Sequence, residues 1–172
     1  MRMIGRPGRD EAADSYFNYI DQAPGDDPLS VIDAQMEDAI TLFDGISDSK
    51  SLFRYAPEKW SIRQVVNHIS DTERAFAFRA LWFARGFADP LPSFDQNTAA
   101  NAVNSDAIGW EALVEDFRNV RLATFSMFRN MPENAWMNIG TASGNRFTVR
   151  ALAFIIPGHV EHHLKILRDR YL

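Results

Sequence analysis

Three of the four histidines are placed where they could share one metal ion. His159 and His163 lie four residues apart in the last amphipathic segment, so a helix there presents both side chains on one face. His68 belongs to an earlier amphipathic segment, and its neighbours on that helical face are mostly apolar. Neutral imidazoles held by rigid elements favour a divalent transition metal, and a water can complete the coordination shell.

The same histidines have a structural explanation that the sequence leaves open. A single histidine on an apolar face is usually a hydrogen-bonded core residue, and a pair spaced by four arises by chance. His162 lies at the edge of the buried face, about 60° from His159 on a helical wheel. Imidazoles that are buried close together each need a polar partner, and a shared cation supplies one to all of them.

The length, cysteine content and net charge of the chain exclude several kinds of site and partner. A chain of 172 residues is expected to form a single domain, residues 1–172. The absence of cysteine excludes disulfides, thiolate nucleophiles and cysteine-based zinc sites. A net charge of -5 argues against a nucleic-acid partner. With no targeting pattern and no long apolar run, we expect a cytoplasmic protein without a membrane partner.

Four segments repeat their apolar residues at steps of three and four, which predicts an all-α protein. Ser61 and Gln64 form a predicted capping box, with Trp60 in front of it placed to pack on Val65. The expected helices run from Pro28 to Ile46, from Ser61 to about Arg85, from Gly109 to Met131, and from a cap at Thr148, just after Phe147, to the C-terminus.

The connections between these helices differ in length. The stretch from Gly86 to Asp106 is long for adjacent antiparallel helices and predicts one crossover. The stretch from Pro132 to Arg146 is rich in Asn and Gly and predicts a turn or short hairpin. The first 27 residues are expected to form a lead-in that packs on the bundle through Tyr16, Phe17, Tyr19 and Ile20.

Three residues near the histidines bear on the predicted helices and on the surroundings of the metal site. Pro157 lies inside the last predicted helix, where it removes a backbone donor and predicts a kink or break. Asp71 and Glu73 are expected on a solvated helix face, although Asp71 has the alternative of orienting a ligand imidazole.

Other catalytic motifs are absent from the chain. The zincin motif requires Glu directly after its first histidine, whereas Val160 follows His159. A di-iron bundle requires Glu three residues before a histidine, and no histidine here has one. The sequence also lacks a nucleophile elbow, a P-loop and a dinucleotide-binding fingerprint.

Several motifs together resemble one family. They are the run from Tyr55 to Arg63, His68 with Asp71, Gly158-His159, and His162-His163-Leu164. In this order they resemble the DinB-like superfamily of metal-binding four-helix bundles, over residues of about 28 to 170. The resemblance implies an up-down-down-up bundle, a homodimer, and a divalent metal, nickel or zinc, bound by His68, His159 and His163. Three imidazoles and a water also suit iron.

The resemblance also implies a class of activity. Characterised relatives include mycothiol-dependent and bacillithiol-dependent transferases and isomerases. We therefore expect a metal-dependent thiol transferase, or a hydrolase, acting on a small electrophilic substrate with a low-molecular-weight thiol. The alternative is a non-catalytic module in which the metal stabilises the bundle or reports stress to a partner. A closed coordination shell would favour the module, and an open position beside a pocket would favour the enzyme. Metal affinity is expected to fall with pH near 6.5.

Overall fold

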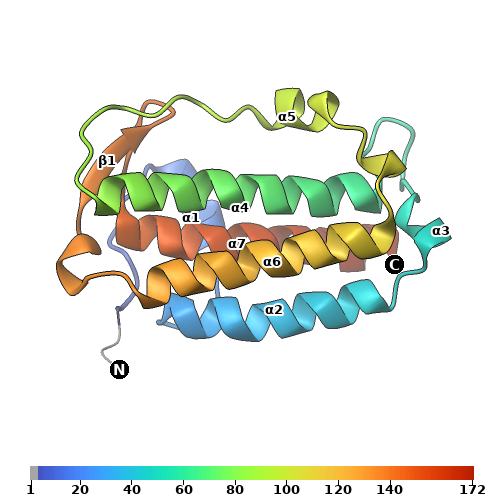
Figure 1. The fold of residues 1–172 in the computed structure, drawn as a ribbon, viewed down its shortest axis with the longest axis horizontal. Coiled ribbons are helices and arrows are strands. Elements are labelled where there is room, and N and C mark those ends of the chain that lie inside the picture. The colour runs from blue at the N-terminus through green and yellow to red at the C-terminus, as the bar shows by residue number, and fades with distance from the viewer. Residues whose placement is uncertain (1–3) are drawn as a thin grey trace.

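The computed structural model describes residues 4–172, and four long helices lie side by side in it (Figure 1). They are α2 (Pro28–Asp44), α4 (Ile62–Ala84), α6 (Trp110–Arg129) and α7 (Val149–Ile166). Helices α2 and α7 run in one direction and α4 and α6 in the other (Figure 1). The predicted all-α, up-down-down-up four-helix bundle is therefore confirmed, with a small two-stranded sheet added to it.

The helix starts follow from their capping residues. Asp27 accepts the backbone N–H of Ser30 at the start of α2, and Pro28 occupies the first helical position. Both hydrogen bonds of the capping box between Ser61 and Gln64 are present in α4. Thr148 accepts the N–H of Ala151 and caps α7 as predicted.

Helix α7 is the central helix of the bundle. Its residues from Ala151 to Val160 are all buried, and α1, α2 and α4 pack around it. A helix covered on several sides must be apolar nearly all round, and this explains the unbroken run of apolar residues before His159. The imidazole of His159 therefore lies deep in the protein, whereas His162 and His163 are half-buried.

Pro157 does not break α7. The helix is continuous from Val149 to Ile166, so the predicted break at the proline is wrong. The side-chain amide of Gln35 on α2 donates to the carbonyl of Pro157 at 3.0 Å, which ties this turn to the neighbouring helix. Beyond Ile166 the chain continues as a π-helical turn, η4 (Leu167–Tyr171). Because α7 is continuous, Leu152 and His159 lie on the same helix.

The connections add shorter elements. The crossover contains α5 (Gln96–Ala102), capped by Asp95, and η2 (Ser105–Ala107), where the sequence had predicted only a polar connection. After η3 (Glu133–Ala135), strands β1 (Ile139–Ala142) and β2 (Asn145–Thr148) form the predicted hairpin. Ser143 and Gly144 both adopt positive φ in its turn, as a tight hairpin requires. Leu91 of the crossover pairs with Ala142 of the hairpin.

The N-terminal segment forms η1 (Asp14–Tyr16) and α1 (Phe17–Ile20), which packs against α7. The contact is close at Gly158, where an added Cβ would lie 1.9 Å from the carbonyl oxygen of Tyr19. Only glycine allows this approach without moving the backbone. It brings the Tyr19 side chain beside His159.

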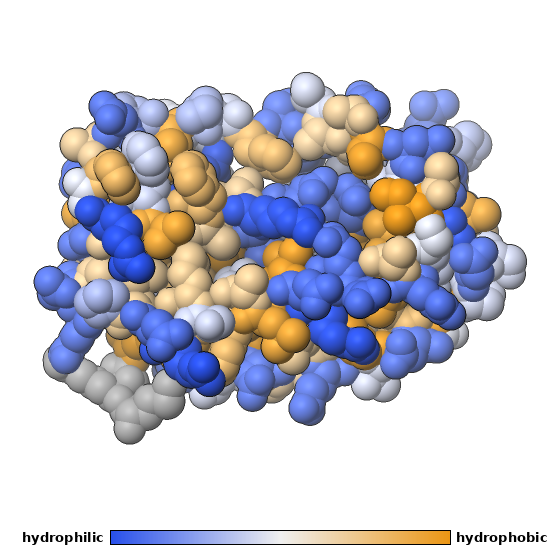
Figure 2. All heavy atoms as spheres, viewed as in Figure 1, coloured by the Kyte–Doolittle hydropathy of each residue, from blue (hydrophilic) through white to orange (hydrophobic). Residues whose placement is uncertain are grey.

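The short helix α3 (Asp48–Ser51) follows α2, and Arg63 of α4 donates to the side chains of Asp48 and Ser51. On the face formed by α2, α4 and α6, hydrophilic and hydrophobic residues lie side by side (Figure 2). No helix among residues 4–172 has the length and apolar character needed to cross a membrane.

Candidate metal centre

The three predicted ligands come together between α4 and α7. The Nε2 atoms of His68 and His159 are 3.1 Å apart, and those of His159 and His163 are also 3.1 Å apart. One ring nitrogen from each histidine lies within 4.8 Å of the others. We call His68, His159 and His163 the histidine cluster. Two neighbouring rigid helices thus aim three imidazole nitrogens at one point.

Burial keeps these imidazoles uncharged. His68 is 5% exposed and His159 is 4% exposed. Desolvation, with repulsion from neighbouring histidines, lowers the pKa of His68 to about 4 and that of His163 to about 3. The pKa of His159 also lies well below its ordinary value, first because of desolvation and then because of repulsion from the other histidines. Neutral imidazoles are the form that binds a metal.

Hydrogen bonding within the cluster does not satisfy these nitrogens. A neutral imidazole offers one hydrogen-bonding position at Nε2, either an N–H or a lone pair. His159 Nε2 has two imidazole nitrogens at 3.1 Å and can pair with only one of them along its ring plane. A cation contacts all three lone pairs at once. The donor set of the cluster therefore fits a divalent transition metal.

Thr72 stands where it can fix the tautomer of His68. Its Oγ1 lies 3.3 Å from Nδ1 of His68, one helical turn away on α4. If Nδ1 carries the proton and donates to this hydroxyl, Nε2 presents its lone pair to the cluster. Trp60 also packs against the His68 ring, with 4.9 Å between ring centroids.

The remaining polar residues near the cluster have other partners. Asp71 accepts the side-chain amide of Asn67 and pairs with Arg74, so its alternative role of orienting a ligand imidazole is not observed. Glu73 was expected on a solvated face, and this is wrong: it is 2% exposed and pairs with the buried Arg121. The error arises because the polar partner of Glu73 comes from another helix.

No fourth histidine and no carboxylate among residues 4–172 joins the histidine cluster. Among residues 4–172, the group of possible metal ligands contains the three histidines but neither His162 nor a carboxylate. His162 is half-buried and packs its ring against His163 and Tyr19. The set of protein ligands is thus incomplete for a tetrahedral site.

The family model of the DinB superfamily matches residues 32–167. The chain belongs to the DinB superfamily. A solved structure of YfiT from Bacillus subtilis, described as "a probable metal-dependent hydrolase with an unusual four-helix bundle topology", is also similar. It matches with a TM-score of 0.68 over 94% of this chain and 91% of that chain, at 15% sequence identity, which shows the shared fold. A comparison with curated proteins gives no match.

In this DinB-superfamily chain a cavity of about 230 Å³ opens beside the histidine cluster. His68 and His159 lie in its wall, together with side chains from the lead-in, α4, the start of α5 and the hairpin. Its aromatic lining is formed by Tyr16, Tyr19, Phe76 and Phe94. Segments outside the four-helix bundle therefore complete the wall of the cavity.

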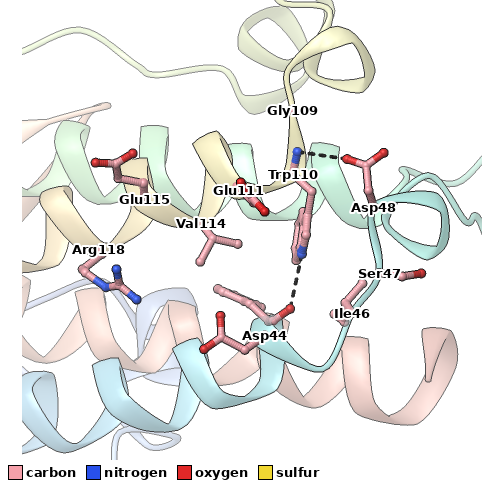
Figure 3. Close-up of a pocket in the computed structure, with 11 residues that line it drawn as sticks. Asp44, Ile46, Ser47, Asp48, Gly109, Trp110, Glu111, Val114, Glu115 and Arg118 are labelled. Atoms are coloured by element: carbon pink, nitrogen blue, oxygen red, sulfur yellow. Dashed lines mark hydrogen bonds between the residues drawn. The ribbon is translucent and has the colours of Figure 1, made fainter.

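A larger hollow of about 730 Å³ lies elsewhere, between the end of α2 and the start of α6 (Figure 3). Its polar lining is mainly acidic, and none of its residues is a histidine. The Trp110 indole crosses it to donate to the carbonyl of Phe43 at 3.2 Å (Figure 3). The volume of a cavity therefore does not identify the site, because His68 and His159, whose pKa values are strongly lowered, line the smaller cavity.

The sequence missed several residues around the cluster. The crossover lines the cavity through Phe94, whereas Trp136 stacks on Phe128 and lies outside the cavity. Arg79 was also overlooked, although it follows His68 by three helical turns and so lies on the same face of α4. That spacing is the signal that could have identified it.

Proposed function

We propose that His68, His159 and His163 bind a divalent transition metal, nickel or zinc, and that the protein transfers a soluble thiol to a small electrophilic substrate. The observation that supports this most strongly is the convergence of three neutral imidazoles beside a cavity, with no fourth histidine or carboxylate from residues 4–172. An open coordination position next to a pocket is typical of catalytic metal sites.

A bound divalent metal supplies Lewis acidity, which lowers the pKa of a nucleophile and polarises an electrophile. The protein's own residues supply the rest. His68 is oriented by Thr72, and Trp60 and Phe76 exclude water from the rings of the cluster. Tyr19 packs against His159 at 5.3 Å between ring centroids, and burial raises the pKa of its hydroxyl. That hydroxyl is therefore protonated at neutral pH and can act as a hydrogen-bond donor.

The thiol in this proposal comes from solution. The chain has no cysteine, so a thiolate nucleophile must be brought by a low-molecular-weight thiol such as bacillithiol, mycothiol or glutathione. Hydrolysis is the second candidate, because the structurally similar YfiT is described as a probable metal-dependent hydrolase. The two reactions differ only in whether a thiol or water attacks the substrate.

A purely structural role for the metal agrees less well with the site. Structural zinc sites usually take all four ligands from the protein, whereas this cluster offers three. The hydrophobic core is also extensive without a metal. The homodimer and the cytoplasmic location expected from the sequence stay predictions.

The proposal is tested with metal-free protein reloaded with nickel or zinc. Consumption of bacillithiol, mycothiol or glutathione is followed with 1-chloro-2,4-dinitrobenzene as electrophile, and hydrolysis is followed with p-nitrophenyl acetate. We expect thiol consumption that requires both the metal and His163, with a His163→Ala variant inactive and His162→Ala retaining activity. Metal-dependent ester cleavage without thiol consumption would replace thiol transfer by hydrolysis. If neither reaction depends on metal, the catalytic proposal fails.

A further inference from the structure

Arg79 is buried in the wall of the cavity beside the histidine cluster, and no carboxylate among residues 4–172 pairs with it. Its side chain is 6% exposed. Its Nη2 donates to the hydroxyl of Ser143 at 2.9 Å and to the carbonyl of Pro92 at 3.2 Å. The hydroxyl of Tyr16 is a further neighbour. None of these partners is a carboxylate.

The other buried arginines of the protein differ from Arg79. Arg63 pairs with Asp48 at 2.6 Å, and Arg121 pairs with Glu73 at 2.9 Å. Among residues 4–172, no carboxylate lies within ion-pair distance of Arg79. A buried charge without a counter-charge is costly, and proteins usually pair it. Desolvation lowers the pKa of Arg79, yet a guanidinium stays protonated.

Arg79 and His68 face the same cavity from one helix. Arg79 follows His68 by eleven positions, which places the two within about 20° on the helix surface and about 16 Å apart along its axis. Side chains of a helix lean toward its N-terminus, so the long Arg79 side chain extends back toward His68. Thr72 and Phe76 lie between them on α4, and all four residues line the cavity.

Asp95 is the acidic residue of the cavity wall, and its carboxylate is engaged elsewhere. It accepts the backbone N–H of Thr98 at 2.7 Å and caps α5. It makes no ion pair with Arg79 within the described part of the chain. The positive charge at the far end of the cavity therefore remains available to a ligand.

We propose that Arg79 binds the carboxylate of the substrate, so that the protein acts on a small carboxylic acid with an apolar body. A planar guanidinium matches a carboxylate with two parallel hydrogen bonds. The aromatic side chains between Arg79 and the histidines suit the apolar part of such a molecule. The cavity volume of about 230 Å³ is below that of drug-sized sites, which restricts the ligand to a small one. This inference rests on the proposed function, because it takes the cavity to be the substrate site.

Benzoate and its neutral isostere benzamide test the inference in metal-free protein by calorimetric titration. We expect benzoate to bind the wild type at least about tenfold more tightly than benzamide, since only benzoate can pair with the guanidinium. Arg79→Met should abolish this preference, and Arg79→Lys should restore part of it through the charge alone. Arg74→Met is the matched control, because Arg74 is exposed on the same helix and pairs with Asp116. This control should bind benzoate like the wild type.

Equal affinity of the wild type for benzoate and benzamide, or no benzoate binding, would overturn the assignment. So would an Arg79→Met variant that folds and keeps the preference. If Arg79→Met does not fold, Ala75→Phe decides the location, since it fills the cavity and should block benzoate. Unchanged binding to Ala75→Phe would contradict the proposal. The titration uses no metal, so a negative result counts against the role of Arg79 and not against the metal-dependent reaction. If benzoate selectivity is intact but the metal-dependent reaction is not observed, only the proposed function fails.

Discussion

Two of the clusters of polar side chains that the bundle buries differ in how their charges are balanced. One is the histidine cluster. The other joins one residue from each of three helices to the backbone of the fourth: Glu73 of α4, Arg121 of α6, Gln35 of α2, and the Pro157 carbonyl of α7. We call it the four-helix network. Arg121 is completely buried, with acceptors at 2.9 Å and 2.7 Å.

The four-helix network contains a balanced pair of opposite charges, whereas the histidine cluster contains only like groups. Opposite charges meet inside the network, so its charge is balanced without a ligand, although Glu73 Oε1 and Arg121 Nε have no hydrogen-bond partner among the described residues. The histidine cluster places three like groups together, with mutual repulsion as one cause of their lowered pKa values, and it borders a cavity. Buried groups whose opposite charges balance indicate a structural role, whereas like groups that converge beside a cavity indicate a ligand.

Breaking the four-helix network should give the largest loss of stability. Arg121→Met leaves the Glu73 carboxylate buried without its counter-charge, and we expect a loss of about 3–5 kcal/mol in the free energy of unfolding. Urea unfolding followed by circular dichroism measures it. The double variant Arg121→Met/Glu73→Leu should lose less, because no buried charge remains. A double variant that is less stable than the single one would contradict the role given to this pair.

The histidine cluster should behave in the opposite way, gaining stability only when metal is present. Metal at about 100 times its Kd should raise the free energy of unfolding of the wild type by about 2.7 kcal/mol. His163→Ala should lose this gain in a thermal melt with and without zinc. His162→Ala is the control and should keep it, since His162 lies outside the cluster. Equal losses in the two variants would remove the distinction between them.

In the metal-free protein, the free energy of unfolding should depend on pH because of the histidine cluster. The pKa of His68 is lowered to about 4 in the folded state, against about 6.5 in an unfolded chain. Between these values the unfolded chain binds a proton that the folded protein does not, so the free energy of unfolding falls as pH drops from 6.5 toward 4. The His68→Gln variant lacks this titrating imidazole, so its free energy of unfolding should fall less steeply with decreasing pH, by up to about 1.4 kcal/mol per pH unit.

Denaturant unfolding across this pH range, with wild type and His68→Gln side by side, measures the difference. Parallel curves would show that the imidazole is not held neutral by the fold. The lowered pKa values also correct the expectation that metal affinity falls near pH 6.5. Because the cluster stays unprotonated to about pH 4 in the folded protein, release should begin at lower pH.

The smallest effect is expected from the hydroxyl beside His68. Thr72→Val removes the acceptor at Nδ1 with little change in shape, and we expect metal affinity to fall by about tenfold. Competition with a fluorescent zinc chelator measures it. Thr72→Ser should return the affinity toward the wild-type value. An unchanged affinity in Thr72→Val would show that the orientation of His68 is fixed by Trp60 and the helix alone.

Local sequence patterns predicted much of the fold. The capping box at Ser61, the cap at Thr148 and the pairing of His159 with His163 depend on residues within a few positions of one another, and all are present. The approach of His68 to this pair depends on helix packing: its apolar helical face predicted that it points into the core, and the family resemblance implied its role as a ligand.

Long-range contacts account for what the sequence did not predict. Glu73 is buried because Arg121 of another helix lies opposite it. Pro157 remains within a continuous helix that Gln35 supports from α2. The cavity also needs three separate segments, since Tyr16, Phe94 and Ser143 come from the lead-in, the crossover and the hairpin. No local pattern specifies such meetings.

Metal content is the most direct test of the central claim, that the histidine cluster is a metal site. Protein purified without an affinity tag is compared with His68→Ala, His163→Ala and the control His162→Ala by elemental mass spectrometry. We expect about one equivalent of nickel or zinc in the wild type and in His162→Ala, and little in the other two variants. Equal metal in all four proteins would contradict the claim.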